Sequence, residues 1–277
     1  MARAIVLAGG FGTRLARVDG DAPSVNGLPA GRPKALFPLG GVPILEIILH
    51  QLHDGGFDQV MLCLFWRADA IVEHFGDGSR LGLELEYSVT ERTLGSAGPL
   101  AAVDPRGEPQ LVLNCDLLTS LDFGSVLVAH RAAGPVATVV GRRHGSRLEY
   151  GMLELSEDGR QVRAHVEKPL VEHVICAGIY VLEPDVWRHL SAGVHLEMPT
   201  LLRRLIEEEA AVMPFLMEEE DSWIDIGRRD TYRTADEAFR HEPHRFLSGP
   251  SGRALLGRVN GSSVSPNPSG GSDGVAT

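Results

Sequence analysis

A short apolar segment that ends in a cluster of glycines constrains the fold of this chain more than any other feature. Residues 3–8 are apolar enough for a buried strand, and glycines follow at positions 9, 10 and 12. Glycine permits a tight turn and lets backbone N–H groups approach an anionic ligand. The pattern predicts a buried strand that leads into a phosphate-binding turn, although a plain strand–turn connection has the same composition.

Two better known phosphate-binding patterns do not fit this turn. The dinucleotide pattern GxGxxG fails because Leu15 stands where the last glycine should be. The GxxxxGK[ST] loop fails because no Lys-Ser or Lys-Thr pair follows. Arg14, two residues after Gly12, instead gives the turn its own cation for a polyphosphate.

Strand-like and helix-like segments alternate over the first half of the chain. This alternation favours a mostly parallel sheet with helices on its faces, that is, a doubly wound, Rossmann-like α/β fold. The expected strands cover residues 3–8, 59–64, 83–88 and 110–114, and the expected helices cover residues 43–53, 68–75 and 123–133.

After about residue 135 the strands follow one another more quickly, which predicts a mixed sheet that carries a small substrate-binding lobe. We expect one domain over residues 1–246. Residues 247–277 are rich in Gly, Ser and Pro and are expected to form a disordered tail. The later strands are expected at 136–141, 151–155, 162–167 and 174–182, and the later helices at 198–210 and 230–239.

Composition excludes several classes of function. The formal net charge of −11 argues against a nucleic-acid binder, which normally carries a basic face. No run of about 18 apolar residues indicates a membrane span. The three cysteines lie far apart without zinc-ligand spacing, which favours reduced thiols in the cytoplasm. The oligomeric state stays open, a homo-oligomer included.

Lysine is rare in this chain: 24 of the 26 basic residues are arginines, and the two lysines are Lys34 and Lys168. The lysine ammonium group is a compact point charge, so lysine and arginine are not interchangeable where the side chain must contact a single phosphate oxygen. Chance survival in an arginine-rich composition is the simpler explanation. Both lysines adjoin a proline, however, in the segments 32–45 and 166–170.

Two aspartates are candidate ligands for Mg²⁺. Asp116 comes just after the expected strand 110–114, and ligands collect at the carboxyl ends of strands in open α/β sheets. Asp225 stands in the apolar segment 222–227, where a carboxylate needs a partner or a metal. Mg²⁺ usually takes one or two carboxylates and keeps several waters. The alternative for Asp116 is that it caps the following turn.

The segment 90–100 combines a polar strand end with small residues at positions 95–98. Small side chains leave room for a flat ring and a ribose against the backbone. A flexible loop with a helix N-cap at Ser96 is the equally simple alternative.

The pair of segments AGGFGTRL (8–15) and RPKALFPLGGVPIL (32–45) resembles the sugar-nucleotide pyrophosphorylases, or nucleoside-diphosphate-sugar nucleotidyltransferases. The resemblance covers roughly residues 3–240 and implies the nucleotide-diphospho-sugar transferase fold. It also implies that the chain joins a nucleoside triphosphate to a sugar 1-phosphate with Mg²⁺. The stretch between Arg14 and Lys34 is about ten residues longer than the family pattern and turn-rich, which predicts an elaborated loop over the phosphates.

The resemblance assigns a role to each matching position. Arg14 and Lys34 are expected to be catalytic, and Asp116 and Asp225 to bind the metal. Nucleotide binding is expected at Leu7, Ala8, Gly9, Gly10, Gly12, Thr13, Glu91, Gly95, Ser96 and Asn114. Sugar-phosphate binding, mainly within residues 136–227, is expected at Tyr150, Gly151, Glu167, Lys168 and Gly178.

The base-recognition segment is similar to that of guanylyltransferases that make GDP-mannose or GDP-heptose, so GTP is the preferred substrate. A thymidylyl- or uridylyltransferase of the same family remains open, as does a non-catalytic nucleotide-binding regulatory homologue. A non-sugar acceptor is a further alternative, against which the segments 167–169 and 177–180 count. The resemblance implies in-line attack by the sugar phosphate without a covalent enzyme intermediate.

Overall fold

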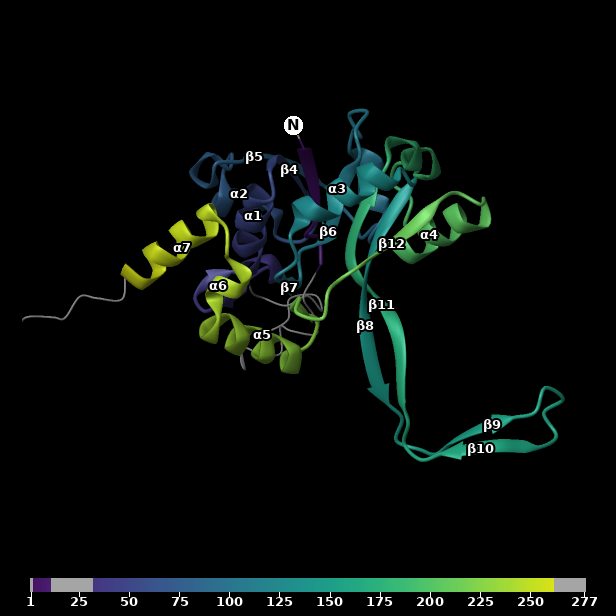
Figure 1. Ribbon diagram of the computed structural model, residues 1–277. Helices are drawn as coiled ribbons and strands as arrows, with labels where there is room; N and C mark the ends of the chain where they lie inside the picture. Colours follow the sequence, from purple (N-terminus) through teal and green to yellow (C-terminus); the bar gives the residue numbers. More distant parts are fainter. Residues whose placement is uncertain (1, 11–31, 262–277) are drawn as a thin grey trace, which may run out of the picture.

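The computed structural model describes residues 2–10 and 32–261, which form a central sheet of seven strands in the order β12-β8-β11-β6-β1-β4-β5 (Figure 1). Strands β5, β4, β1 and β6 run parallel, whereas β11 is antiparallel to both β6 and β8. The mixed sheet predicted from the sequence is thereby confirmed. The strands are β1 (Ala2–Leu7), β4 (Phe57–Leu64), β5 (Glu84–Val89), β6 (Gln110–Asn114), β8 (Ala137–Arg147), β11 (Leu170–Leu182) and β12 (Val212–Leu216).

Alternate residues of the central strands enter two separate cores, as expected for side chains that repeat every two residues. In β1, Ala4 and Val6 belong to one core and Ile5 to the other. In β6, Leu113 faces the first core and Val112 the second. Helices therefore cover both faces of the sheet, which confirms the doubly wound architecture.

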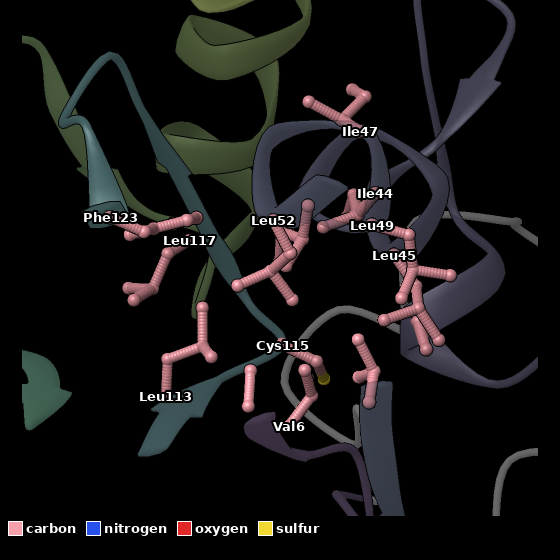
Figure 2. Close-up of a cluster of buried hydrophobic side chains, with 14 of the residues drawn as sticks. Val6, Ile44, Leu45, Ile47, Leu49, Leu52, Leu113, Cys115, Leu117 and Phe123 are labelled. Carbon is pink, nitrogen blue, oxygen red and sulfur yellow. The ribbon is translucent and has the colours of Figure 1, made fainter. Parts of the chain in front are cut away.

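The larger core lies under α1 (Ile44–Asp54), α2 (Ala68–Phe75), α3 (Phe123–Ala133) and α5 (Arg229–His241). Figure 2 shows apolar side chains of α1 near those of the β6–β7 segment and Phe123 at the start of α3. The second core lies under α4 (Met198–Glu207) and the short helices η4 (Gly98–Ala102) and η5 (Pro184–His189). A further short helix, η3 (Ser79–Leu81), precedes β5.

Short strand pairs and one short helix stand beside the central sheet. The helix η2 (Lys34–Leu36) precedes the pair β2 (Pro38–Leu39) and β3 (Val42–Pro43). Strand β7 (Leu117–Thr119) follows β6 directly and pairs antiparallel with β13 (Trp223–Asp225). The β7–β13 pair brings the segment after β6 next to a segment about a hundred residues later in the chain.

The C-terminal part of the described chain forms α6 (Pro243–Phe246) and α7 (Pro250–Gly261). The prediction of a disordered tail is therefore wrong for residues 250–261, and residues 262–277 lie outside the described part. Asp54, at the end of α1, accepts hydrogen bonds from the backbone N–H groups of Ser251 and Gly252. Leu255 and Leu256 are buried in the larger core. Tertiary contacts with α1, not local composition, hold this helix.

Strands β8 and β11 continue beyond the sheet as an antiparallel pair, and β9 (Met152–Leu155) and β10 (Val162–Val166) form its far end (Figure 1). We call residues 142–174 the arm. The arm lies in the part of the chain for which a substrate-binding lobe is predicted, a role that stays a prediction, and its apolar side chains are largely exposed. Within residues 2–10 and 32–261, no helix has the length and apolarity needed to cross a membrane.

Candidate active site

A pocket of about 420 Å³ opens at the carboxyl ends of β1, β4 and β6. Leu7, Leu64 and Asn114 end these strands and line the pocket, together with Gly9 and Gly10 after β1. Strands β4 and β6 lie on opposite sides of β1, so the pocket sits where the strand order reverses. This crevice is where ligands bind in open α/β sheets.

The pocket contains an ion pair between η2 and the short segment that joins β6 to β7. Lys34, in η2, is 8% exposed, and its Nζ lies 2.5 Å from Oδ2 of Asp116. Asp116 follows β6 directly, and both residues line the pocket. A buried ammonium group needs a partner of opposite charge, and Asp116 supplies it. The structure thus brings together one predicted catalytic residue and one predicted metal ligand.

Asp225 stands on the strand next to Asp116. It ends β13, where its register partner is Leu117, and the backbone N–H of Ile226 donates to the carbonyl oxygen of Asp116 at 2.8 Å. Trp223 fixes this strand by donating its indole N–H to the carbonyl oxygen of Ala177 in β11. The two predicted metal ligands therefore belong to hydrogen-bonded neighbouring segments, of which Asp116 lines the pocket whereas Asp225 is exposed and does not.

The carboxylates of Asp116 and Asp225 are the type of donor that Mg²⁺ takes from a protein. Within residues 2–10 and 32–261, no three His, Cys, Asp or Glu side chains form a group that could hold a metal ion. A pair of carboxylates is what Mg²⁺ usually takes from a protein, with waters and substrate phosphates completing its ligands. Asp116 and Asp225 are the residues that would hold it.

Two cysteines line the pocket and remain neutral thiols. Burial raises the pKa of Cys63 to about 12. Burial, together with the neighbouring charge of Asp116, raises the pKa of Cys115 to about 12. The thiolate is the nucleophilic form of cysteine, so neither side chain is suited to form a covalent intermediate at neutral pH.

The segment predicted to recognise the base forms another wall of the pocket. Gly95 and Ser96 line the pocket, as do Thr93 and Leu94, whereas Glu91 is exposed and does not. Gly95 has a φ of +74°, and a Cβ atom there would lie 2.5 Å from the carbonyl oxygen of Leu196. This glycine therefore permits close packing against the chain before α4, a role different from the open space for a ring that its small size suggested.

The same packing adds residues to the pocket that the sequence analysis did not single out. His195 and Glu197 line it from the segment before α4, and Phe65 and Arg92 line it from the loops after β4 and β5. The Met-Pro pair at 198–199 marks a helix start, because proline is favoured in the first helical turn. Nothing in the sequence indicates which loop this helix start contacts.

The residues predicted to bind the sugar phosphate do not meet at the pocket, although Gly151 and Glu167 are neighbours on the arm, where Oε2 of Glu167 lies 2.9 Å from the Cβ position of Gly151. Tyr150, Gly151, Glu167 and Lys168 lie on the arm, are exposed and do not line the pocket. Gly178 lies nearer, in an irregular part of β11, where its Cβ position is 2.7 Å from Nδ2 of Asn114. The roles of these five residues stay predictions.

Of the remaining predicted nucleotide-binding and catalytic residues, one lies in the described part of the chain and three do not. Ala8 is buried directly after β1, and its backbone N–H donates to the carbonyl oxygen of Cys63 at 2.9 Å. The turn residues Gly12, Thr13 and Arg14, and the predicted loop up to residue 31, lie outside the described residues.

The fold and the pocket are those of an α/β protein with a ligand pocket at a topological switch point. A family model described as nucleotidyl transferase matches residues 3–242. The chain belongs to this family.

The curated relatives include enzymes named for different nucleotides, among them guanylyltransferases and a uridylyltransferase. The chain is 30% identical over 280 residues to the mannose-1-phosphate guanylyltransferase of Mycobacterium tuberculosis, an alignment that covers 95% of this chain and 71% of that protein. It is 29% identical over 251 residues to the UTP–glucose-1-phosphate uridylyltransferase of a Synechocystis strain, covering 83% of this chain. The chain spans 61% of the length of the Synechocystis protein.

Solved structures show the same fold at low identity. A putative glucose-1-phosphate thymidylyltransferase from Bacillus anthracis is 19% identical, with a TM-score of 0.66 over 87% of this chain and 96% of that chain. HddC from Yersinia pseudotuberculosis, solved in complex with GMP-PN, is 22% identical, with a TM-score of 0.62 over 86% of this chain and all of that chain.

Proposed function

We propose that this protein transfers a nucleotidyl group from a nucleoside triphosphate to a sugar 1-phosphate and releases pyrophosphate, in a reaction that depends on Mg²⁺. The observation that carries the proposal is the buried Lys34–Asp116 pair in a pocket at the carboxyl ends of β1 and β6. Family membership and the sugar-1-phosphate nucleotidyltransferases among its relatives support this reaction class.

The charges of the substrates define what the protein must do. A sugar 1-phosphate has a second pKa of about 6, like other phosphomonoesters, so it is mostly a dianion at neutral pH. One of its oxygens attacks the α-phosphorus, the bond from that phosphorus to the β-phosphate oxygen breaks, and pyrophosphate leaves. No general base is needed, because the attacking oxygen carries no proton. The obstacle is repulsion between two polyanions.

The residues of this chain reduce that repulsion. Lys34 places an ammonium group at the pocket, and Gly9 and Gly10 line it, so their backbone N–H groups are candidate donors to a phosphate. Arg14 would add a second cation. When Mg²⁺ is bound, it stabilises the charge that develops on the transferred phosphoryl group. Neutral Cys63 and Cys115 support direct transfer without an enzyme-bound intermediate.

The sugar-phosphate residues of the arm belong to the proposal as well. Lys168 would hold the phosphate of the sugar phosphate, and Glu167 would accept hydrogen bonds from sugar hydroxyls. Because the structure places both on the exposed arm, this role requires the arm to approach the pocket when substrate is bound.

GTP is the proposed nucleotide, and the cytoplasm is the proposed compartment. The segment around Glu91 and Gly95 supports guanine, as do the mannose-1-phosphate guanylyltransferases among the relatives. The cysteines Cys63, Cys115 and Cys176 are free thiols, which supports a reducing compartment.

Pyrophosphate release from five nucleoside triphosphates against mannose, glucose and heptose 1-phosphates tests substrate choice. We expect GTP to give the highest kcat/KM with at least one sugar 1-phosphate. A higher kcat/KM with UTP or dTTP would overturn the guanine preference, and no release from any pair would overturn the reaction itself.

A further inference from the structure

Two segments about a hundred residues apart form one wall of the pocket. We call residues 93–98 the nucleotide loop and residues 193–197 the strap. The backbone N–H groups of Ala97 and Gly98 both donate to the carbonyl oxygen of Leu196, at 2.9 and 3.0 Å. The N–H of Leu196 in turn donates to the carbonyl oxygen of Leu94 at 2.9 Å. The strap therefore holds the backbone of the nucleotide loop.

One carboxylate of the strap completes this attachment. Oε2 of Glu197 accepts hydrogen bonds from both the backbone N–H of Ser96, at 3.0 Å, and its hydroxyl group, at 2.7 Å. The hydroxyl oxygen of Ser96 accepts a bond from the N–H of Met198 at 2.8 Å. On the other side, Oε1 of Glu197 lies 3.3 Å from Nε2 of His195. One oxygen of this carboxylate is thus held by Ser96, and the other lies near the His195 ring.

The engagement of Glu197 matters because the ligand of this pocket is expected to be a polyanion. A carboxylate that turned freely into the pocket would repel a triphosphate. Tied to Ser96, the same carboxylate fixes a loop instead. A loop that is ordered before the ligand arrives also avoids the free-energy cost of ordering on binding.

We propose that Glu197 is a positioning residue for the nucleotide: it holds the nucleotide loop in the shape that accepts the base and ribose. This inference rests on the proposed function, because it takes the ligand of the pocket to be a nucleoside triphosphate. Glu197 acts through Ser96 and Gly95 and does not itself touch the reacting phosphates. Replacing Glu197 would remove hydrogen bonds from Ser96 to a charged acceptor, and such bonds are stronger than those between neutral groups.

The test compares three glutamate variants. Glu197→Ala removes the acceptor, whereas Glu197→Gln keeps an amide oxygen that can accept both bonds from Ser96. Glu208→Gln is the control at the other end of α4: Glu208 is 49% exposed, close to the 50% of Glu197, and lies 3.5 Å from both His189 and Arg188, away from the nucleotide loop. Each variant is assayed for kcat and for the KM of GTP and of the sugar 1-phosphate.

We expect Glu197→Ala to raise the KM for GTP about tenfold, the loss of roughly one charged hydrogen bond, and to leave the KM for the sugar 1-phosphate within about twofold. Glu197→Gln should return the KM for GTP to within about threefold of wild type, and Glu208→Gln should not change it. An unchanged KM for GTP in Glu197→Ala would overturn the proposal, as would an equal rise in both KM values or no rescue by glutamine.

A double-mutant cycle guards against a general folding defect. Ser96→Ala alone should also raise the KM for GTP, and the double variant should raise it by less than the product of the two single effects, because both single variants remove the bond from the Ser96 hydroxyl group to Glu197. Additive effects would contradict the proposal. If the wild-type protein transfers no nucleotide, the proposed reaction fails, while GTP affinity measured by calorimetry still tests Glu197. Weaker binding by Glu197→Ala then supports its role, and equal binding overturns it.

Discussion

The ammonium nitrogen of Lys34 lies 2.5 Å from a carboxylate oxygen of Asp116, although the two residues are 82 positions apart. The pair joins a cation proposed to bind phosphate with a carboxylate proposed to bind metal. In the free protein, the lysine therefore occupies an oxygen that a divalent cation would use. Arrival of metal and nucleotide would release Lys34 toward the phosphates.

This competition predicts opposite effects of replacing Lys34 on two measurements. Lys34→Met should bind Mn²⁺ several-fold more tightly than wild type without nucleotide, because Asp116 loses its internal cation. The same variant should lose nucleotidyl transfer by on the order of 100-fold, because a group that stabilises transition-state charge is gone. Mn²⁺ affinity is read by electron paramagnetic resonance of the free ion.

The second lysine is the control. Lys168 lies on the exposed arm, so Lys168→Met should leave Mn²⁺ affinity of the free protein unchanged. Unchanged or weaker Mn²⁺ binding by Lys34→Met would contradict the competition.

The two aspartates are predicted to be needed for turnover. Asp116→Asn and Asp225→Asn keep the shape of each side chain and remove its charge, and each should lower kcat by on the order of 100-fold or more. Asp122→Asn is the control, since Asp122 caps α3 by accepting the N–H of Gly124 and asparagine caps equally well. Near wild-type turnover by Asp116→Asn would remove this residue from the metal site.

Gly178 is predicted to matter for both stability and activity. A side chain there must adopt a φ of +74°, which costs a non-glycine residue about 1–3 kcal/mol, and its Cβ would displace the Asn114 side chain. Gly178→Ala should therefore lower the melting temperature and raise the KM for GTP. Gly134→Ala is matched, because Gly134 has a φ of +65° but open space around its Cβ position. It should lower stability alone; an equal loss of activity in both variants would show that Asn114 is not involved.

Helix α7 is predicted to contribute to the stability of the whole domain. Leu256 is 5% exposed in the core that α1 shares, so Leu256→Ala should lower the free energy of unfolding by about 2–4 kcal/mol. Val128→Ala, at a position 69% exposed, should have little effect. Denaturant unfolding measures both, and equal midpoints would mean that α7 does not support the core.

Local pattern was enough to predict many of the elements. The bounds of α2, α3 and β6 agree with the prediction, because apolar periodicity and flanking glycines act over a few residues. Helix α7 was missed because its stability comes from contacts with α1. The sequence did hold one signal: Ile44, Leu45, Ile48 and Leu49 give α1 an apolar surface wider than one helix face, which requires a second cover.

The candidate site was predictable to the extent that topology controls it. Parallel strands bring their carboxyl ends to one edge, so the meeting of the glycine-rich turn, Asn114 and Asp116 follows from the strand pattern. The contact between Ser96 and Glu197 depends on how two loops pack, which no local pattern encodes. The direction of the arm is likewise a tertiary property, and the spacing of its strands could not place Lys168 relative to the pocket.

The most direct test of the proposed reaction follows the α-phosphate of the nucleotide. The protein is incubated with α-³²P-labelled GTP, Mg²⁺ and mannose 1-phosphate, and the products are separated. The account predicts that the label moves into a sugar nucleotide, with one pyrophosphate released for each molecule formed and no transfer when the sugar phosphate is omitted. Label that stays in GTP with every sugar 1-phosphate and every other labelled nucleotide, or that appears as GMP without a sugar phosphate, would contradict it.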